Sequence, residues 1–542
     1  MLWQTERKYT KLKNMKIRSV LLTVIFVFSA FGGCSHNTEE QVPEIRVPQG
    51  KADELDPIRP EDCPGGAPKL AAGRPAAWTI MVYQAGDNNL EDYLDADLAQ
   101  MEMGYRKTDQ VNVLVQQDKE LEDGVWRYRV RHNNDPEVRG SELVGYSSVE
   151  PDTGNWQTLA AFGEWATVCY PAEHYMLIVS GHGTGWSETE SGEDGEPIVW
   201  EDLPEDEEDD SPTPQDQDGA DNNSDDSADE DDSTNTDRMS IEAEGEPYRA
   251  IAYDDTSGSS LNLKELATAL EYISDAARRD YDPHYINRLV IYGSDACLMQ
   301  TVEVTSALGN AVTYVVGSEK TEPAQGWPYS TILRDLTARP FAYARAPQDL
   351  TKLIVEKYGI AYGPNGGQGH KKDQTLSSVN LDHSRRLVND MTKIASLLTE
   401  LREESETGYD LDQYIWAARD DTPIFSATYV DLAEFLMNLR EKLIEVGLMP
   451  RKYQHWYGDE RFRTLRKTID EATLEIFDMT LANLDAPLPT PDGKPDGVSI
   501  YFPDWKYSYV LHLENYLNSP FSQKTGWGSL IENLIENRYS YY

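Results

Sequence analysis

The sequence predicts an α/β protein, with a mostly parallel β-sheet flanked by helices and a mainly helical C-terminal region. Short apolar runs, which are typical of buried strands, alternate with segments whose leucines recur at helical spacing. This alternation indicates strands joined by crossover helices, and hence a parallel sheet. Beyond about residue 340, long amphipathic helical segments dominate instead.

The first expected strand begins near Ala77 and breaks into a polar turn at 87–89, and a helix is expected over 90–105. The segment 125–133 alternates polar and apolar residues, which indicates an edge strand. The other expected strands are 111–118, 174–182, 288–297, 312–319, 374–381 and 497–503. The other expected helices are 262–279, 298–309, 345–358, 384–403, 427–446 and 460–480. We therefore expect a first domain over 75–340 and a helical region over 341–542 that completes the fold.

The N-terminus is predicted to direct export. Basic residues precede the apolar stretch 19–30, which suits a signal peptide and is too short to cross a bilayer. Small residues before Cys34 resemble the lipobox of bacterial lipoproteins, so 1–34 is expected to hold a signal peptide and a lipidated Cys34 that anchors the protein in the cell envelope. Ordinary cleavage nearby, giving a secreted protein, is the alternative, and either Met1 or Met15 can be the start. Residues 35–74, rich in Pro, Glu, Asp and Gly, are expected to form a flexible tether.

The charge distribution limits the kind of partner. A formal net charge of −46 argues against nucleic acid, whose phosphates attract Lys and Arg, and suits neutral or basic partners. Half of this charge falls in one segment, because residues 187–237 contain 23 Asp or Glu and no Lys or Arg. Such a segment cannot bury enough apolar surface to fold, so 187–247 is expected to be a disordered insert. Its stretch 216–226 lacks the spacing of an EF-hand loop, which leaves only weak calcium attraction as an expectation.

Four cysteines occur in the chain. If Cys34 carries lipid, an odd number remains in an exported protein, which points to a reactive thiol. Cys63 and Cys169 could pair in an oxidising compartment, although the sequence alone does not show it. Cys297 follows a buried strand and precedes an expected helix, a position that lowers the pKa of a thiol and favours the nucleophilic thiolate. A buried structural cysteine is the alternative.

A histidine ends the strand 174–182 in the run Ser-Gly-His-Gly-Thr-Gly. Flanking glycines let the backbone turn and approach a substrate, so His182 is a candidate catalytic base, and a turn that merely contains a histidine is the alternative. Ligands of parallel sheets bind at the carboxyl ends of the strands, so His182 and Cys297 could share one crevice. The backbone amides of Gly183 and Cys297 are then candidates for an oxyanion hole.

Seven motifs occur in order between residue 78 and about residue 503: MVYQAGDNNLE, SGHGTGW, YDDTSG, SDACLMQ, GSEKTEPAQGWPY, TLSSVNL and GVSIYFP. They resemble the clostripain family of cysteine peptidases, in the caspase–legumain–gingipain superfamily. The resemblance implies a caspase-like fold and an endopeptidase with a His–Cys dyad, which is His182 and Cys297 here. It also implies a preference for Arg or Lys before the scissile bond, maturation by cleavage between the His and Cys segments and, in some members, a need for calcium. The dyad chemistry itself requires no cofactor, and no third catalytic residue stands out.

A basic substrate side chain needs a shielded carboxylate as its partner. Asp295 matches the acidic position that lines the family's specificity pocket, and the alternative is that it caps a helix starting at Cys297. The resemblance also implicates the loop 318–323, with Thr321 as a pocket wall. Some members carry a second Asp shortly after this threonine, and Glu322 is the candidate substitute, which leaves the choice between Arg and Lys open.

The acidic insert occupies the stretch in which relatives are cut. Because it lacks basic residues before Arg238, self-cleavage is expected after Arg238 or Arg249. The alternative is that the acidic run covers the pocket as a removable guard. The expected substrates are proteins or peptides that contain Arg or Lys. Two other functions stay open: a non-catalytic binding homologue, and a transpeptidase or ligase that uses the same dyad.

Overall fold

The computed structural model describes part of the chain, and Cys34, Arg238, Arg249 and the acidic insert 187–247 lie outside the described residues. All described residues belong to one compact unit that begins at Val42. The described residues are 42–45, 48, 55, 57–64, 75–119, 124–136, 138–186, 250–279, 288–369, 374–403, 408–426, 428–448, 459–484, 496–503 and 513–539.

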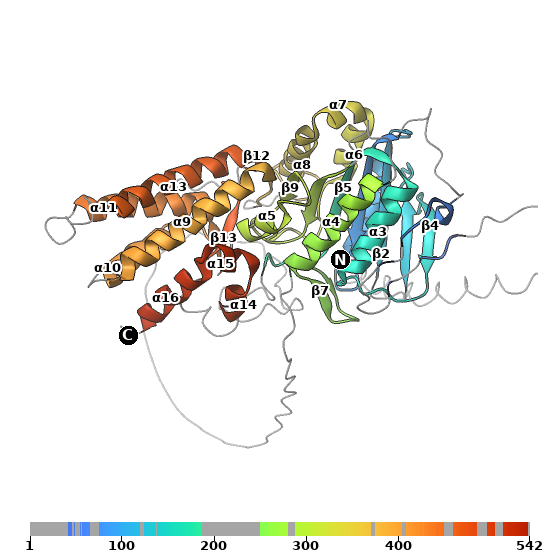
Figure 1. Ribbon diagram of the computed structural model, residues 1–542. Helices are drawn as coiled ribbons and strands as arrows, with labels where there is room; N and C mark the ends of the chain where they lie inside the picture. Colours follow the sequence, from blue (N-terminus) through green and yellow to red (C-terminus); the bar gives the residue numbers. More distant parts are fainter. Residues whose placement is uncertain are drawn as a thin grey trace, which may run out of the picture. The chain divides into compact units, whose positions relative to one another are not determined.

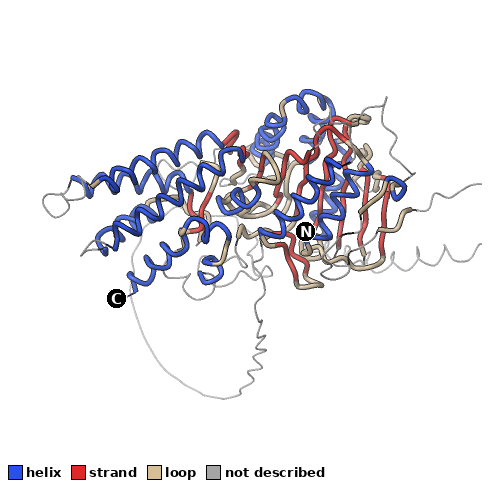
Figure 2. The backbone as a smooth tube through the Cα atoms, in the orientation of Figure 1, coloured by secondary structure: helices blue, strands red, loops and turns tan. Residues whose placement is uncertain are grey.

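A mixed sheet forms the centre of the described structure, with the strand order β12-β10-β9-β8-β5-β1-β2-β3-β4 (Figures 1 and 2). The five strands from β9 to β2 run parallel, and antiparallel strands complete both sides. This arrangement confirms the expected α/β class. The strands are β1 (Ala76–Gln84), β2 (Val111–Asp118), β3 (Val125–Arg129), β4 (Glu142–Ser147), β5 (Ala172–Ser180), β8 (Arg288–Asp295), β9 (Tyr314–Gly317), β10 (Ser377–Asn380) and β12 (Thr480–Asn483).

Two details of the sheet differ from the sequence prediction. Strand β3 is not an edge strand, because β4 pairs with its outer side and the side chain of Arg127 is buried. The sequence of β4 contains a glycine, and its exposed residues include Leu143 and Tyr146, so the strand lacks a regular alternation of apolar and polar residues. Strands β10 and β12 lie beyond residue 340, so the sheet draws on both expected regions of the chain.

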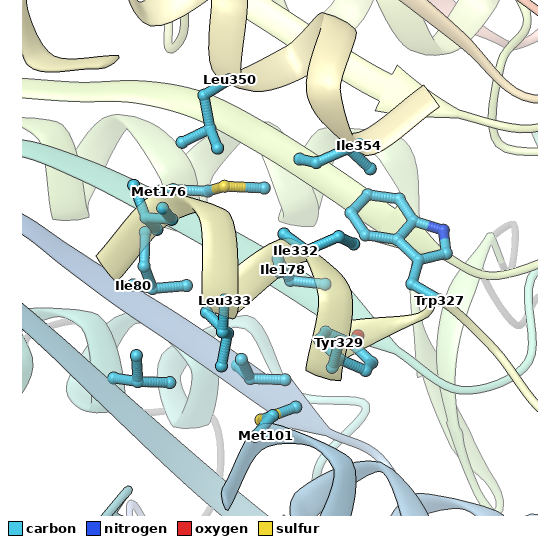
Figure 3. A pocket seen from close by; sticks show the side chains of 13 residues that line it. Ile80, Met101, Met176, Ile178, Trp327, Tyr329, Ile332, Leu333, Leu350 and Ile354 are labelled. Carbon is cyan, nitrogen blue, oxygen red and sulfur yellow. The ribbon is translucent and has the colours of Figure 1, made fainter. Parts of the chain in front are cut away.

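Helices cover both faces of the sheet. Side chains alternate between the two faces along each buried strand, so the central strands contribute apolar side chains to a core on each face. On β5, Met176 and Ile178 face the core beneath α6 and α8, whereas Leu177 and Val179 face the core beneath α3 and α4. Figure 3 shows the first of these cores, where Ile332 and Leu350 close over Ile80 and leave a void of only about 10 Å³. The helices are α2 (Glu91–Gly104), α3 (Trp156–Cys169), α4 (Leu263–Arg279), α6 (Tyr329–Ala338), α7 (Pro340–Arg345) and α8 (Pro347–Ala361).

The C-terminal part is mainly helical, as expected (Figure 1). Its apolar side chains belong to the same buried core as those beneath α3 and α4. The expected strand 497–503 is shorter and forms a separate small sheet, in which β13 (Ser499–Tyr501) pairs with β11 (Tyr429–Asp431). Among the described helices, none combines the length and apolar character that a membrane crossing needs. The helices of this part are α9 (Ser384–Glu403), α10 (Gly408–Asp420), α11 (Leu432–Leu448), α13 (Glu460–Met479), α14 (Leu513–Leu517), α15 (Pro520–Thr525) and α16 (Trp527–Tyr539).

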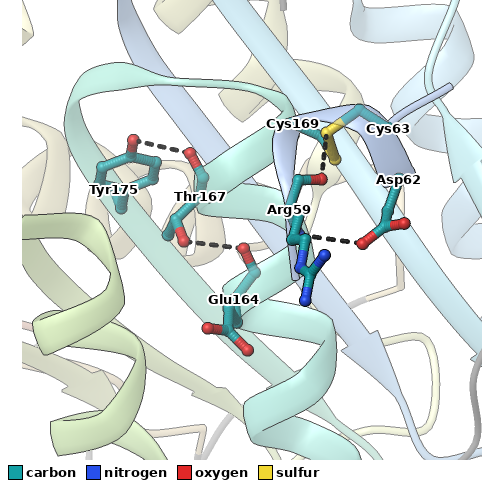
Figure 4. Close-up of a disulfide and its surroundings, with 7 residues drawn as sticks. All are labelled: Arg59, Asp62, Cys63, Glu164, Thr167, Cys169 and Tyr175. Carbon is teal, nitrogen blue, oxygen red and sulfur yellow. Dashed lines mark hydrogen bonds between the residues drawn. A yellow bond between two sulfur atoms is a disulfide. The ribbon is translucent and has the colours of Figure 1, made fainter. Parts of the chain in front are cut away.

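A disulfide joins Cys63 to Cys169, the last residue of α3, with their Cα atoms 5.3 Å apart (Figure 4). It settles the pairing that the sequence left open, and Cys297 keeps a thiol. Cys63 follows the 3₁₀ turn η1 (Pro60–Asp62), and Glu44 makes a β-bridge to Tyr146 of β4. Both pieces belong to the segment 35–74, so this segment is not a free tether along its whole length. The buried side chains of Cys63 and Ile45 hold this segment to the domain.

Candidate active site

His182 and Cys297 line one cavity of about 250 Å³ at the carboxyl ends of β5 and β8. The two strands are parallel neighbours, and their register places Ser180 opposite Asp295. His182 and Cys297 each stand two residues beyond this pair, so the sheet brings together side chains that are distant in sequence. A Cβ atom at Gly183 would lie 2.7 Å from the carbonyl oxygen of Cys297, so this position requires glycine.

The backbone around Cys297 differs from the expectation of a helix start. Leu298 adopts a φ of +59°, and its N–H donates to the carbonyl of Lys320 at 3.0 Å. Gln300 pairs with Ser318 in the same way, at 2.9 Å. The helix α5 (Val302–Leu308) therefore begins later and is capped by the Thr301 side chain. Because residues 298–300 bond to a neighbouring loop, the prediction that a helix N-terminus activates Cys297 is wrong.

A backbone amide contacts the sulfur instead. The N–H of Glu322 donates to Sγ of Cys297 at 3.2 Å, and Cys297 is 9% exposed. The carbonyl oxygen of Glu322 lies 3.9 Å from the same sulfur and can accept the thiol proton. Cys297 is therefore a shielded but reachable thiol with an N–H directed at its reactive atom.

His182 is buried, and its Nε2 lies 2.7 Å from Oδ1 of Asn89, in the turn that follows β1. The ring of Tyr253 meets the imidazole edge-on, with the ring centroids 6.3 Å apart. Burial lowers the pKa of His182 to about 4. The imidazole is therefore neutral at pH 7, with the Nε2 proton directed at Asn89 and the acceptor nitrogen at Nδ1.

Asn89 is absent from the sequence prediction, which assigned no partner to His182. A signal existed, because the polar turn 87–89 ends β1 and β1 is the other neighbour of β5. The register places Gln84 opposite Ser180, which brings this turn beside His182.

Three carboxyl groups line the same cavity: Asp295, Glu322 and Asp97. Asp295 accepts hydrogen bonds from the Trp327 N–H at 3.1 Å and the Tyr329 hydroxyl at 2.7 Å. Burial raises the pKa of Asp295 to about 6. Burial and the nearby charge of Asp295 hold the pKa of Glu322 and that of Asp97 well above their usual range. The cavity wall is thus rich in carboxyl groups that a cationic group would ionise.

Two of these acids bear on the sequence prediction. The Asp295 carboxylate lines the cavity and does not cap α5, whose N-cap is Thr301. Asp97 was not predicted, although it lies in α2 beside the apolar positions Leu94 and Leu98 and is itself buried. A charged residue on the buried stripe of an amphipathic helix is the signal that could have revealed it.

Thr321 is exposed and does not line the cavity, in contrast to its expected role as a pocket wall. The loop is fixed on its inner side, where the Lys320 N–H bonds to Ser318 Oγ and to Thr375 Oγ1, both at 3.1 Å. Glu322, which directly follows Thr321, turns its carboxyl group into the cavity, whereas the side chain of Thr321 faces solvent.

Among the described residues, Asp87, Asp118 and Asp254 form a group that could hold a metal ion, with one carboxylate oxygen of each within 4.8 Å of the others. None of the three lines the cavity of His182 and Cys297.

Comparison with known proteins identifies the family. The model of the clostripain family, peptidase C11, matches residues 82–206 and 237–533, well over half of the chain. Clostripain of Hathewaya histolytica is 28% identical over 140 residues, which cover 23% of this chain and 27% of that protein. The chain thus spans about a quarter of the curated relative it matches.

Solved structures share the fold. A secreted C11 cysteine protease from Bacteroides thetaiotaomicron, in complex with an irreversible peptide inhibitor, is 15% identical, with a TM-score of 0.51 over 84% of this chain and 100% of that chain. The C11 protease iotapain from the same organism is 10% identical, with a TM-score of 0.50 over 83% of this chain and 99% of that chain. At these identities the likeness supports the caspase-like fold, and the family match confirms what the ordered motifs predicted. The chain belongs to the clostripain family.

Proposed function

We propose that the protein is an exported cysteine endopeptidase that cleaves after Arg or Lys and matures by cutting its own chain between His182 and Cys297. The observation that carries the proposal is the single cavity lined by His182, Cys297 and three carboxyl groups. A thiol, a neutral imidazole and an acidic wall are the parts that thiol-based hydrolysis beside a basic side chain requires.

The residues divide the chemistry between them. Nδ1 of His182 takes the Cys297 proton, and the thiolate attacks the carbonyl carbon of the substrate. The backbone amides of Gly183 and Cys297 hold the developing oxyanion. His182 then protonates the leaving amine, and water hydrolyses the thioester. These steps draw on the chain's own residues and require no cofactor.

The carboxyl groups of the cavity select the basic side chain. A guanidinium or ammonium group that enters beside Asp295, Glu322 and Asp97 removes their mutual repulsion and favours their ionised forms. The fixed positions of the two hydrogen-bond donors to Asp295 keep this carboxylate oriented before the substrate arrives.

Export is supported by the N-terminal signal and by the Cys63–Cys169 disulfide, which suits an oxidising compartment. The related Bacteroides protease is described as secreted. We infer that a lipid on Cys34 retains this protein at the cell envelope, with protein or peptide substrates outside.

One assay tests the proposed activity. Wild type and Cys297→Ala are incubated with fluorogenic peptides that end in Arg, Lys or Gln, with and without an added amine. We expect release from the Arg and Lys peptides by wild type only. No release by wild type would support a binding homologue, and conjugates to the amine in place of free acid would support a transpeptidase.

A further inference from the structure

Three buried aspartates come together at the turn that carries Asn89. Asp87 follows β1, Asp118 ends β2 and Asp254 ends β6 (Ile251–Asp254), so all three occupy carboxyl ends of strands. Their exposed fractions are 0%, 1% and 2%, and one carboxylate oxygen of each lies within 4.8 Å of the others. Buried carboxylates this close repel one another unless one of them takes up a proton or a positive charge lies between them.

The described residues supply no such charge. None of their ion pairs involves Asp87, Asp118 or Asp254, and the adjacent Lys119 extends to Asp95 at 2.9 Å. Glu150 adds further negative charge near Asp118.

Each carboxylate is oriented by backbone donors. The N–H of Thr256 donates to Oδ2 of Asp87 at 3.1 Å, and the N–H of Lys119 donates to Oδ1 of Asp118 at 3.0 Å. Oδ2 of Asp118 is buried and receives no hydrogen bond from the described residues; Oδ1 of Asp87 meets no N–H or hydroxyl donor among them, although the Asp87 carboxyl lies within hydrogen-bonding reach of Asp254. Two fixed carboxylate oxygens without an N–H or hydroxyl donor, in an oxygen-lined site, are what a hard cation requires.

We propose that Asp87, Asp118 and Asp254 bind one divalent cation, and that this cation is Ca²⁺. Calcium takes oxygen ligands at about 2.3–2.6 Å, so two of its ligands can be as far apart as about 5 Å. Magnesium demands shorter distances of about 2.0–2.1 Å and near-ideal octahedral geometry, which suits a tighter group. The site is separate from the cavity of His182 and Cys297.

The site has a structural path to the catalytic histidine. Asn88 follows Asp87, and its Nδ2 donates to the carbonyls of Ala85 at 3.0 Å and Tyr253 at 2.9 Å. Tyr253 precedes Asp254. A cation that joins Asp87 to Asp254 therefore fastens together the turn that holds Asn89 and the strand that holds Tyr253, and these two residues contact the His182 ring. The proposed role of the ion is to position His182.

The test measures binding and melting, so it does not depend on the proposed activity. The full chain carrying Cys297→Ala is stripped with EDTA, and calcium binding is followed by calorimetry and by the melting temperature. Asp118→Asn is compared with Asp109→Asn, a matched change at an exposed aspartate in the same background. The acidic insert is present in every variant, so any calcium that it binds contributes equally.

We expect saturating calcium to raise the melting temperature of the parent and of Asp109→Asn by at least about 3 °C. Asp118→Asn should lose one bound ion and this shift, and should melt at or above the parent in EDTA, because it removes a repelling carboxylate. A shift retained in Asp118→Asn, or no shift in the parent, overturns the site. An equal shift with magnesium overturns the choice of calcium. If Asp118→Asn fails to fold, Asp254→Asn replaces it in the comparison. The melting temperature of the parent with and without calcium still tests the proposed site.

Discussion

Nε2 of His182 lies 2.7 Å from Oδ1 of Asn89, although the two residues are 93 positions apart. This contact fixes the ring and directs its Nε2 proton at Asn89, so Nδ1 is the nitrogen that the proposed mechanism uses to exchange a proton with Cys297. Asn89 therefore acts as a positioning residue. Loss of this contact should therefore affect kcat first.

We expect Asn89→Ala to lower kcat by about 10- to 100-fold with little change in KM, since general acid–base groups contribute about 10²–10⁴-fold and this one would be misaligned but present. Asn89→Asp keeps an acceptor oxygen and should restore part of kcat. Its added charge should also raise the pKa of His182, which moves the acid limb of the kcat profile to higher pH. Equal losses in kcat and unchanged acid limbs for both variants would indicate a merely structural role.

The carboxyl groups of the cavity should determine specificity. Removal of one partner of a buried ion pair costs about 3–5 kcal/mol, so Asp295→Asn should lower kcat/KM for Arg-ended peptides by at least about 10²-fold. Asp97→Asn and Glu322→Gln should act in the same direction. Thr321→Ala is the matched control, because its side chain is exposed and should leave kcat/KM unchanged. A loss of equal size with neutral peptides would contradict a role in charge selection.

The pKa of Asp295, raised by burial to about 6, should appear in the pH profile. Below about pH 6 the free enzyme carries a protonated Asp295, so kcat/KM for an Arg-ended peptide should fall as the pH is lowered through this value. The pKa of His182 is about 4 and does not account for a limb at pH 6. Asp295→Asn should remove the limb, and kcat/KM profiles from pH 4 to 8 would show whether it persists.

The same shift has a defined sign for stability. The folded state raises the pKa of Asp295 above its usual 3.8, so folding favours the protonated form. This group therefore makes the protein less stable as the pH rises from about 4 to about 6. Urea unfolding across this range should show a steeper loss of stability with pH in wild type than in Asp295→Asn, in which the other buried carboxyl groups still contribute.

Loss of the Cys63–Cys169 disulfide should destabilise the protein by about 2–5 kcal/mol, because the bond closes a long loop between residues 106 positions apart. Chemical denaturation of the Cys63→Ser, Cys169→Ser double variant measures this loss. Cys297→Ser is the control, since this thiol lies outside the disulfide and its replacement should leave the unfolding free energy nearly unchanged.

The structure near Ala250 favours one of the two expected cleavage positions over the other. Ala250 is buried, its N–H donates to Leu261 at 2.8 Å, and its carbonyl accepts from Thr184 at 2.9 Å. Cleavage after Arg249 would require this residue to leave the fold, so we expect the cut after Arg238. N-terminal sequencing of the matured protein should give Met239, and Arg238→Ala should block maturation while Arg249→Ala permits it. A new N-terminus at Ala250 would refute this assignment.

Much of the geometry of the candidate site could be predicted from the sequence, because buried apolar runs reveal strands and the carboxyl ends of parallel strands share one edge of the sheet. This reasoning brought His182 and Cys297 together. It failed at Leu298 and Gln300, whose backbone groups bond to residues 318–320, since local helical spacing carries no information about such pairing. Asp97 could have been predicted as a site residue, because it is a charged residue on the apolar stripe of an amphipathic helix. Asn89 required the strand order, which the sequence alone did not provide.

Both cysteines of the disulfide precede the acidic insert, and this fact constrains the matured molecule. A cut anywhere between residues 187 and 249 yields two polypeptides with no covalent link between them through Cys63 or Cys169. The pairing of β5 with β8, together with the bridge from Gly183 to Ile251, then holds the histidine of one polypeptide against the cysteine of the other. The mature enzyme would be a non-covalent heterodimer that separates on a denaturing gel without reductant. Since each half alone would expose an unpaired central strand, dissociation of the two halves would favour aggregation over reassembly.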